Sequence, residues 1–317
     1  MKNIVFLDAE TIPDHIKIPE FNFSHTYKAY PFTESSSIVE RAADAEIIIT
    51  NKVPLNSETL AQLPKLEMIA VAATGYDVID LESCKKKGVI LSNVRGYATT
   101  SVPEHVLAMI FALKRNLFAY HNDVMNGIWR EHRQFCFFNH PISDVSGSTI
   151  GVFGKGSLGE AVGKLAEAVG MKVLFAEHKG AEVIRDGYYP FEEVLSAADV
   201  ISLHCPLTPQ TKHMIGEKEL SLMKKGAILV NAGRGGLVDE EALVKALQEG
   251  EIAGSGVDVL SREPPINGNP LLDDTIPNLL VTPHIAWGSD SAITTLMGQV
   301  VENINAYAAG NPIRQVV

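Results

Sequence analysis

Three side chains of this chain could together carry out acid–base chemistry on an anionic substrate: Arg234, Glu263 and His284. Each follows a short apolar run typical of a β-strand, within ILVNAGRG, SGVDVLSREPP and LLVTPHIAW. Ligands gather at the carboxyl ends of strands in a parallel α/β sheet, so we expect the three to meet. Arg234 could bind a carboxylate and polarise a carbonyl, His284 could supply or remove a hydroxyl proton, and Glu263 could hold the imidazole and favour its charged form. This combination fits the reduction of a 2-keto acid.

A glycine-rich turn precedes these segments. In STIGVFGKGSLGEAVGKLAEAVG, Gly154, Gly156 and Gly159 lie between a predicted strand and a predicted helix. The first glycine permits a tight turn, the second lets the backbone approach a pyrophosphate, and the third allows close packing of the helix. The N–H groups and dipole of that helix would face the anion. The pattern therefore predicts a dinucleotide site, although a glycine turn without a ligand is the alternative.

Glu177 is the expected contact of the dinucleotide's ribose. It ends the next predicted strand, KVLFAE, about 20 residues after the glycines, where a ribose-binding carboxylate is expected. A carboxylate would repel a 2′-phosphate, so Glu177 favours NAD. The neighbouring His178 and Lys179 keep NADP open.

The elements that position these residues alternate between strand-like and amphipathic runs, which predicts parallel sheets with helices on their faces. The resulting fold class is α/β, with two Rossmann-like units. Strand-like runs of the first unit cover residues 3–9, 46–50, 67–73 and 89–94, and amphipathic runs cover 36–45, 57–66 and 80–88. Strand-like runs of the second unit cover residues 148–153, 172–176, 199–205, 226–233, 252–259 and 278–283.

A long helix over residues 99–120, opened by a Ser101-x-x-Glu104 capping box, is the predicted crossing between the units. A last helix within residues 289–312 ends at Gly310 and returns to the first unit. The predicted domains are residues 1–100 with 288–317, and residues 101–287. Residues 120–147 carry four aromatic side chains of Trp and Phe without a clear period. We expect either an arm that packs on a second subunit or a loop folded over its own domain.

Composition excludes several classes of protein. The chain has 317 residues, is 46% hydrophobic and carries a net charge of −11, which disfavours nucleic acid and anionic lipid as partners. Cys84, Cys136 and Cys205 are widely spaced, as in a reducing compartment. No signal-peptide pattern or run of transmembrane length occurs, so we expect a cytoplasmic protein. An anionic substrate would need a local cation, namely Arg234 or Lys52.

Two further groups carry weaker signals. Thr74 and Gly75 follow a predicted strand and could bind a carboxylate through backbone N–H groups, or form a simple turn. Lys52 could face the same ligand or be solvated. His204, Cys205 and His284 lack the spacing of metal ligands, and hydride transfer needs no metal, so no metal is expected.

With these residues in place, the chain resembles the D-isomer-specific 2-hydroxyacid dehydrogenases along essentially its whole length. The motifs GKGSLG, HCPLTPQT, NAGRGGLVDEEAL, GVDVLSREPP and TPHIAW occur in the family's order. The resemblance implies that Arg234, Glu263 and His284 are the catalytic residues, that Asp258 lies near the nicotinamide, and that Thr74 and Gly75 bind the substrate carboxylate. It also implies an inserted coenzyme domain that mediates a homodimer. HIAW and AATG look most like glycerate dehydrogenases, which are hydroxypyruvate reductases.

We therefore expect an NAD-dependent oxidoreductase that interconverts a 2-keto acid and a D-2-hydroxy acid, namely hydroxypyruvate and D-glycerate. A broader reductase of the D-lactate or phosphoglycerate type and a dinucleotide-sensing interaction protein are the alternatives. The expected substrate contacts are Lys52, Thr74, Gly75, Arg234 and Trp287. The expected coenzyme contacts are Gly154, Gly156, Ser157, Leu158, Gly159, Glu177, His204, Cys205, Pro206, Thr211, Asn231, Ala232, Gly233 and Asp258.

Overall fold

The chain forms two compact units, which a computed structural model describes over residues 1–317. Unit 1 consists of Met1–Tyr97 and Gly288–Val317, and unit 2 of Ala98–Trp287. The chain therefore leaves unit 1 once and returns to it. The sequence placed the first crossing at residue 101, three residues after the point where unit 2 begins.

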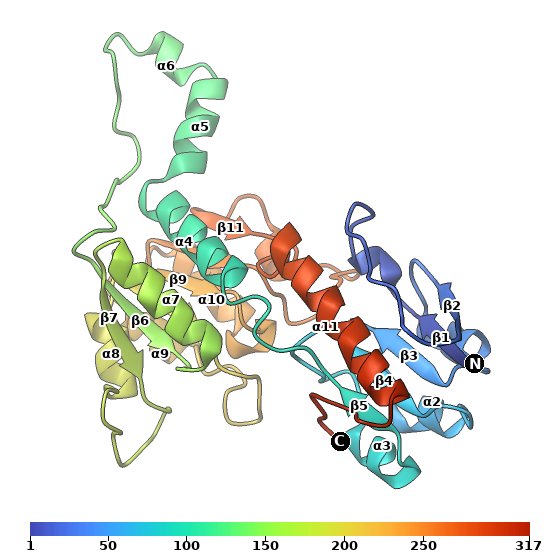
Figure 1. The fold of residues 1–317 in the computed structure, drawn as a ribbon. Helices are drawn as coiled ribbons and strands as arrows, with labels where there is room; N and C mark the ends of the chain where they lie inside the picture. The colour runs from blue at the N-terminus through green and yellow to red at the C-terminus, as the bar shows by residue number, and fades with distance from the viewer. The chain divides into compact units, whose positions relative to one another are not determined.

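Unit 1 is built on a five-stranded parallel sheet in the order β2-β1-β3-β4-β5 (Figure 1). Its strands are β1 (Lys2–Phe6), β2 (His25–Ala29), β3 (Ile47–Thr50), β4 (Met68–Val71) and β5 (Ile90–Ser92). Its helices are α1 (Ile38–Ala42), α2 (Ser57–Ala61), α3 (Leu81–Lys87) and α11 (Asp290–Ala308). α11 packs against β4 and is followed by Gly310 at φ +79°, as the sequence predicted.

Unit 2 holds a six-stranded parallel sheet in the order β11-β10-β9-β8-β6-β7. Its strands are β6 (Thr149–Phe153), β7 (Lys172–Ala176), β8 (Val200–Leu203), β9 (Ile228–Asn231), β10 (Gly254–Val257) and β11 (Leu279–Val281). Its helices are α4 (Ser101–Lys114), α5 (Leu117–Met125), α6 (Ile128–Glu131), α7 (Ser157–Ala168), α8 (Phe191–Ala197), α9 (Glu217–Leu222) and α10 (Glu240–Gln248). The predicted class, α/β with two parallel sheets, is confirmed.

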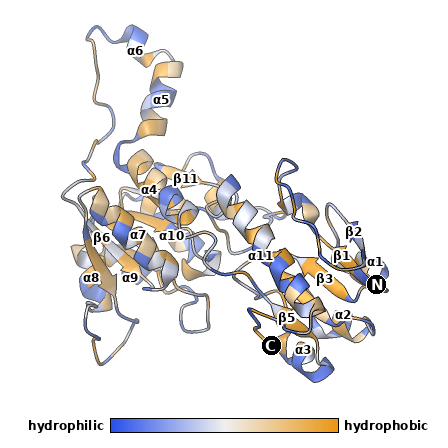
Figure 2. Ribbon diagram, viewed as in Figure 1, coloured by the Kyte–Doolittle hydropathy of each residue, from blue (hydrophilic) through white to orange (hydrophobic).

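Burial explains why these runs form central strands. Every residue of β3, β4, β8 and β9 is buried, so a continuous apolar run suits both faces of each strand. Figure 2 shows hydrophobic residues concentrated in the strands of both sheets. The sequence missed β2 because four of its five residues are exposed and HTYKA carries little apolar signal.

The helix predicted over residues 99–120 is wrong in two respects. It is interrupted at Asn116, whose φ of +49° breaks the helical path between α4 and α5. The predicted capping box does not form, because Ser101 already lies inside α4 and Thr100 is its N-cap. The Ser101 hydroxyl instead donates to the carbonyl of Trp287, at 3.1 Å. A tertiary acceptor has therefore replaced the local one.

The sequence placed the arm at residues 120–147; in the structure the segment that extends away from the sheet of unit 2 is residues 116–145, here called the arm (Figure 1). They are partly helical, with α5 and α6, where the sequence showed no period. Tyr120 donates to the carbonyl of His140 at 2.7 Å, and His140 bonds Asp123 at 2.9 Å, so the arm is held by its own contacts. Its exposed apolar side chains are Leu117, Phe118, Val124, Met125, Trp129, Phe135, Phe138 and Ile142.

No helix of the structure combines the length and apolar character that crossing a lipid bilayer requires.

Candidate active site

The glycine-rich turn joins β6 to α7 as the sequence predicted. Gly154 has φ +104°, and a Cβ there would lie 2.6 Å from the backbone nitrogen of Cys205. A Cβ on Gly159 would lie 1.9 Å from the carbonyl oxygen of Gly154, so the start of α7 packs directly on the turn. Gly156 is the N-cap of α7, and no atom lies within 4 Å of the Cβ it would carry. The turn is tight on its protein side and open above Gly156.

The open side suits an anion. The first N–H groups of an α-helix lack partners within the helix, and no side chain caps α7. With the helix dipole, the N–H groups of Ser157 and Leu158 make an anion site of the kind that binds a pyrophosphate. The residues present therefore fit a dinucleotide.

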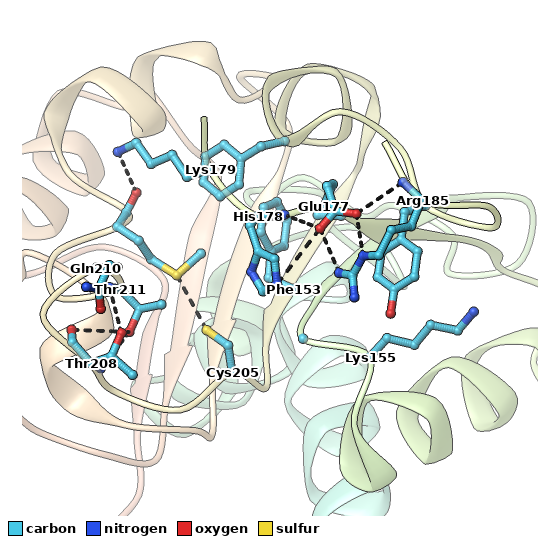
Figure 3. Close-up of a pocket in the computed structure, with 15 residues that line it drawn as sticks. Phe153, Lys155, Glu177, His178, Lys179, Arg185, Cys205, Thr208, Gln210 and Thr211 are labelled. Carbon is cyan, nitrogen blue, oxygen red and sulfur yellow. Dashed lines mark hydrogen bonds and ion pairs between the residues drawn. The ribbon is translucent and has the colours of Figure 1, made fainter. Parts of the chain in front are cut away.

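Next to this turn lies a pocket of about 400 Å³ within unit 2 (Figure 3). The predicted contacts that line it are Gly154, Glu177, Cys205 and Thr211. Its lining includes Phe153, Phe191 and Met214, which give a ring-shaped ligand an apolar surface. The sequence analysis did not single out two cations of this pocket: Lys155 is a variable position of the GKGSLG motif, and Arg185 has no motif around it.

Glu177 follows β7, yet its carboxylate points to Arg185. The Nε and Nη2 atoms of Arg185 donate to the two carboxylate oxygens, each at 2.6 Å. This guanidinium holds the pKa of Glu177 at about 2, assisted by the backbone N–H of His178. Glu177 is thus an ionised carboxylate that already has a cationic partner. Its predicted bond to ribose stays a prediction.

His284 and Glu263 form the predicted pair. Nδ1 of His284 lies 2.6 Å from Oε2 of Glu263, with 23% and 33% of the two side chains exposed. The other carboxylate oxygen, Oε1, accepts the backbone N–H of Leu260 at 2.8 Å, which fixes the orientation of Glu263. A carboxylate at Nδ1 leaves Nε2 of the imidazole as the atom that can exchange a proton with a ligand.

Asp258 holds the loop that presents His284. Its buried carboxylate accepts the hydroxyl of Thr282 at 2.6 Å and the backbone N–H groups of Ile285 and Ala286, both at 2.9 Å. The backbone N–H of His284 donates to the carbonyl of Asp258 at 2.7 Å. His284 itself has φ +56°, a strained conformation that the surrounding bonds enforce. The structure therefore gives Asp258 a supporting role that the sequence had not suggested.

Arg234 follows β9 on a turn closed by Asn231. The Asn231 side chain donates to the carbonyl of Arg234 at 2.9 Å and accepts the N–H of Gly233 at 3.1 Å. Gly235 lies so close to the loop that contains Leu260 and Glu263 that a Cβ on Gly235 would be 2.0 Å from the carbonyl carbon of Leu260. Since Glu263 binds the N–H of Leu260, the loops that carry Arg234 and Glu263 are in contact. Trp287 donates from Nε1 to the carbonyl of His284 at 2.9 Å.

The loop after β8 carries His204, Cys205, Pro206 and Thr211. Thr211 donates to the carbonyl of Pro206 at 2.7 Å and so closes this loop beside the pocket. His204 bonds Ser202 at 2.8 Å, and although part of its surface is accessible, burial of the imidazole lowers its pKa to about 4. No group of three or more His, Cys, Asp or Glu side chains is arranged to hold a metal ion.

Lys52, Thr74 and Gly75 belong to unit 1, at the carboxyl ends of β3 and β4. The carbonyl of Thr74 accepts the side-chain amide of Asn93 at 2.8 Å. The backbone N–H of Lys52 donates to the buried carboxylate of Asp8 at 2.6 Å. The sequence did not single out Asp8, which lacks a motif around it. The predicted substrate contacts of unit 1 stay predictions.

Comparisons with known proteins agree with this geometry. Residues 107–286 match the family model described as "D-isomer specific 2-hydroxyacid dehydrogenase, NAD binding domain". A Haemophilus influenzae protein, provisionally named a 2-hydroxyacid dehydrogenase, is 54% identical over 96% of this chain and 97% of its own. Glycerate dehydrogenase of Methylorubrum extorquens is 49% identical over 98% of each chain. The NAD-complexed D-isomer-specific 2-hydroxyacid dehydrogenase of Lactobacillus delbrueckii superposes with a TM-score of 0.75 at 27% identity, over 99% of this chain and 100% of that one.

Proposed function

This chain belongs to the D-isomer specific 2-hydroxyacid dehydrogenase family, with NAD as its coenzyme, and we propose that it interconverts hydroxypyruvate and D-glycerate. The family and coenzyme predicted from the sequence are confirmed by the matched NAD-binding domain. The choice of substrate is supported by the 49% identity to a glycerate dehydrogenase. The observation that carries the proposal is the 2.6 Å contact between His284 and Glu263 on the loops that follow β10 and β11.

His284 moves the proton in this proposal. When bound, NADH supplies the hydride that adds to the keto carbon, and the product oxygen then needs a proton. Nε2 of His284 gives that proton in reduction and takes it back in oxidation. Glu263, fixed by the N–H of Leu260, orients the imidazole through Nδ1 and balances its charge. The pair is therefore one proton-handling unit.

Arg234 binds the substrate carboxylate and polarises the carbonyl. Its guanidinium offers two parallel N–H groups to a carboxylate, a geometry that an ammonium lacks. The turn closed by Asn231 fixes the backbone from which Arg234 extends. Asp258 keeps the 282–287 loop in the conformation that presents His284.

Initial rates of NADH oxidation test the substrate. We expect hydroxypyruvate to give the highest kcat/KM in a panel with glyoxylate, pyruvate and 3-phosphohydroxypyruvate. A preference of tenfold or more for pyruvate or for the phosphorylated acid would replace hydroxypyruvate by that acid, while leaving the reaction class intact. No turnover with any member of the panel would contradict the proposal.

The same proposal includes a cytoplasmic homodimer held by the arm. Phe118, Phe135 and Phe138 are 56%, 87% and 78% exposed, although the arm is ordered by its own hydrogen bonds. Such an apolar surface is typical of a protein–protein interface, and a second copy of this chain is the partner that is always present. Light scattering should give twice the chain mass of 34.4 kDa. A monomer at micromolar concentration would contradict this part of the proposal.

The three free cysteines agree with the reducing conditions of the cytoplasm that this proposal includes.

A further inference from the structure

Helix α4 contacts both ends of the 282–287 loop, which carries the proposed proton donor. At the last residue of the loop, the carbonyl of Trp287 accepts the hydroxyl of Ser101 at 3.1 Å. At the first residue, Oγ1 of Thr282 lies 3.1 Å from Nε2 of His105. Ser101 and His105 are four positions apart in α4, so they share one face of the helix. A single face of α4 therefore holds the loop at both ends.

Packing fixes this face of α4 independently of the loop. The helix packs against β10 and β11. Met109, buried and one further turn along the same face, lies so close to β10 that a Cβ on Gly256 would be 2.9 Å from its sulfur. The missing side chain at Gly256 thus permits the close approach of the two backbones. The place of His105 beside the loop is set by this packing.

The hydrogen bonds between His105 and the loop run in one direction. Thr282 donates its only hydroxyl proton to Oδ1 of Asp258, at 2.6 Å, so its oxygen can only accept from His105. His105 therefore carries a proton on Nε2 and donates this N–H to Thr282. Oδ1 of Asp258 is itself 3.7 Å from Nε2, beyond the range of a hydrogen bond. His105 reaches the carboxylate through the threonine.

Asp258 transmits this order to the rest of the loop. Its Oδ1 also accepts the backbone N–H of Ile285, and its Oδ2 that of Ala286, both at 2.9 Å. These residues directly follow His284, whose φ of +56° is strained for a residue with a side chain. Such strain persists only where the surrounding bonds enforce it. The orientation of the Asp258 carboxylate therefore decides where the imidazole of His284 points.

We propose that His105 is a positioning residue for His284 and acts through Thr282 and Asp258. The inference rests on the proposed function, because it takes His284 to be the group that moves the proton. The N–H of His105 holds the Thr282 hydroxyl in the rotamer that bonds Asp258. Asp258 in turn holds the loop in the conformation that presents the imidazole. His105 itself exchanges no proton with the substrate.

Variants of His105 test the donated N–H. His105→Leu should lower kcat by about 10- to 100-fold, the effect of misplacing a reacting group by about 1 Å. His105→Gln places an amide N–H near the position of Nε2 and should keep kcat within about threefold of normal. The shorter amide of His105→Asn cannot reach Thr282, so this variant should resemble His105→Leu and replaces it if His105→Leu does not fold. The Kd for NADH should stay within about twofold in all three, because the anion site at α7 is untouched.

His121→Leu is the matched control, since His121 is an exposed histidine of α5. It should change neither kcat nor the Kd for NADH. A kcat for His105→Leu within threefold of normal would overturn the proposal. Equal losses of kcat for His105→Gln and His105→Leu would do the same, because the donor would then be irrelevant.

A double-mutant cycle tests the route through Thr282. Thr282→Val keeps the shape of the side chain and removes the hydroxyl, so it should itself lower kcat. Because His105 acts through that hydroxyl, His105→Leu should lower kcat by less than about threefold when added to Thr282→Val. Losses that multiply across the two sites would show that His105 acts by another route and would overturn the proposal.

Hydrogen exchange of the loop gives a readout that does not depend on turnover. The N–H groups of Ile285 and Ala286 should exchange about tenfold faster or more in His105→Leu than in the wild-type protein, and at the wild-type rate in His105→Gln. Unchanged exchange in a His105→Leu protein that is folded by circular dichroism would overturn the proposal. The kinetic measurements use whichever keto acid of the panel is reduced, so a different substrate leaves them intact. If the exchange pattern holds and no acid is reduced, only the proposed function fails.

Discussion

Two turns at the carboxyl ends of strands treat their backbone N–H groups differently: the turn after β3 in unit 1, here called the closed edge, and the turn after β6 in unit 2, here called the open edge. In unit 1, the Asp8 carboxylate accepts the N–H groups of Asn51, Lys52 and Val53, at distances from 2.6 to 3.3 Å. In unit 2, no side chain caps α7, and the space above Gly156 is empty of protein atoms for 4 Å. The turn after β3 is therefore closed by a side chain of its own unit, whereas the turn after β6 is open to an anion.

This difference shows why the alternation of strand-like and amphipathic runs does not by itself locate a ligand site. Unpaired N–H groups are costly when buried, so a chain must bond them internally or leave them accessible. The first solution stabilises the fold, whereas the second leaves free energy to be gained on binding. Substitutions at the open edge are therefore expected to change activity more than stability, and substitution of Asp8 to do the reverse.

The largest effect is expected for His284→Ala. Losing the group that moves the proton should lower kcat by about 10³-fold in both directions, within the range of general acid–base catalysis. NADH affinity should change little, because the anion site at α7 is untouched. Steady-state rates and NADH titrations would measure both quantities. His213→Ala is the control, since His213 is a partly exposed histidine of the same unit whose nearest carboxylate oxygen is 3.9 Å away. A His284→Ala protein with more than a tenth of normal kcat would refute the role of His284.

Arg234→Lys should have the next largest effect. It keeps the charge and loses the bidentate geometry, so kcat/KM for the keto acid should fall about 100-fold, or roughly 3 kcal/mol. NADH affinity should stay within about twofold of normal. Arg262→Lys, a change of the same kind at an exposed arginine nearby, should leave kcat/KM unchanged. An equal loss in both variants would show that the effect is not specific to Arg234.

Asp8→Ala tests the closed edge. Removing the acceptor of three backbone N–H groups should destabilise unit 1 by about 2 to 3 kcal/mol, the penalty for unsatisfied buried donors. Both tryptophans, Trp129 and Trp287, lie in unit 2, so their fluorescence follows that unit while circular dichroism follows both. Urea unfolding should therefore move in circular dichroism more than in fluorescence. Asp14→Ala, at an exposed aspartate of unit 1, should move neither signal.

Gly156→Val tests the open edge with less disturbance. No protein atom lies within 4 Å of the Cβ that the variant would carry and φ is −93°, so the variant should fold with a Tm within about 2 °C of normal. It would occupy the space reserved for the anion, and NADH affinity should fall tenfold or more, about 1.4 kcal/mol. Gly226→Val has an equally open position before β9 and should bind NADH normally. Unchanged NADH binding by Gly156→Val would mean that the coenzyme does not approach this turn.

His204 provides the smallest expected effect. Its backbone lies beside Gly154 at the open edge, but its imidazole is hydrogen-bonded to Ser202 within the protein. Burial lowers its pKa to about 4, against about 6.5 in an unfolded chain. The unfolded state therefore binds the extra proton, so the stability that depends on neutral His204 is complete above pH 6.5 and is lost as the pH falls towards 4. His204→Gln should flatten this fall by up to about 1.4 kcal/mol per pH unit. Fluorescence-detected urea unfolding at pH 7, 6 and 5 would measure it, and identical slopes would exclude His204 as the cause.

Local patterns were sufficient to predict most strands and the pairing of His284 with Glu263. The central strands β3, β4, β8 and β9 are buried throughout, and each catalytic candidate follows a strand: Arg234 three residues after β9, Glu263 six after β10 and His284 three after β11. Features that depend on distant partners were not predictable. The hydrogen bond from Ser101 to Trp287 joins residues 186 positions apart. No residue pattern around Asn116 predicts the break between α4 and α5. Arg185 and Asp8 have no motif around them, and only folding brings them to their carboxylate or N–H partners.

The bond between Ser101 and Trp287 also bears on the order in which the chain folds. It joins the beginning of unit 2 to its last residue, so folded unit 2 holds the two ends of its own segment together. Closing a flexible segment of this length costs about 4 to 5 kcal/mol of chain entropy, and a folded insert removes that cost. α11, which packs on β4, follows unit 2 in the chain, so it is synthesised after unit 2 and the sheet of unit 1 lacks this helix until then. Unit 2 is therefore expected to fold first, and its folded state to bring α11 to the sheet of unit 1.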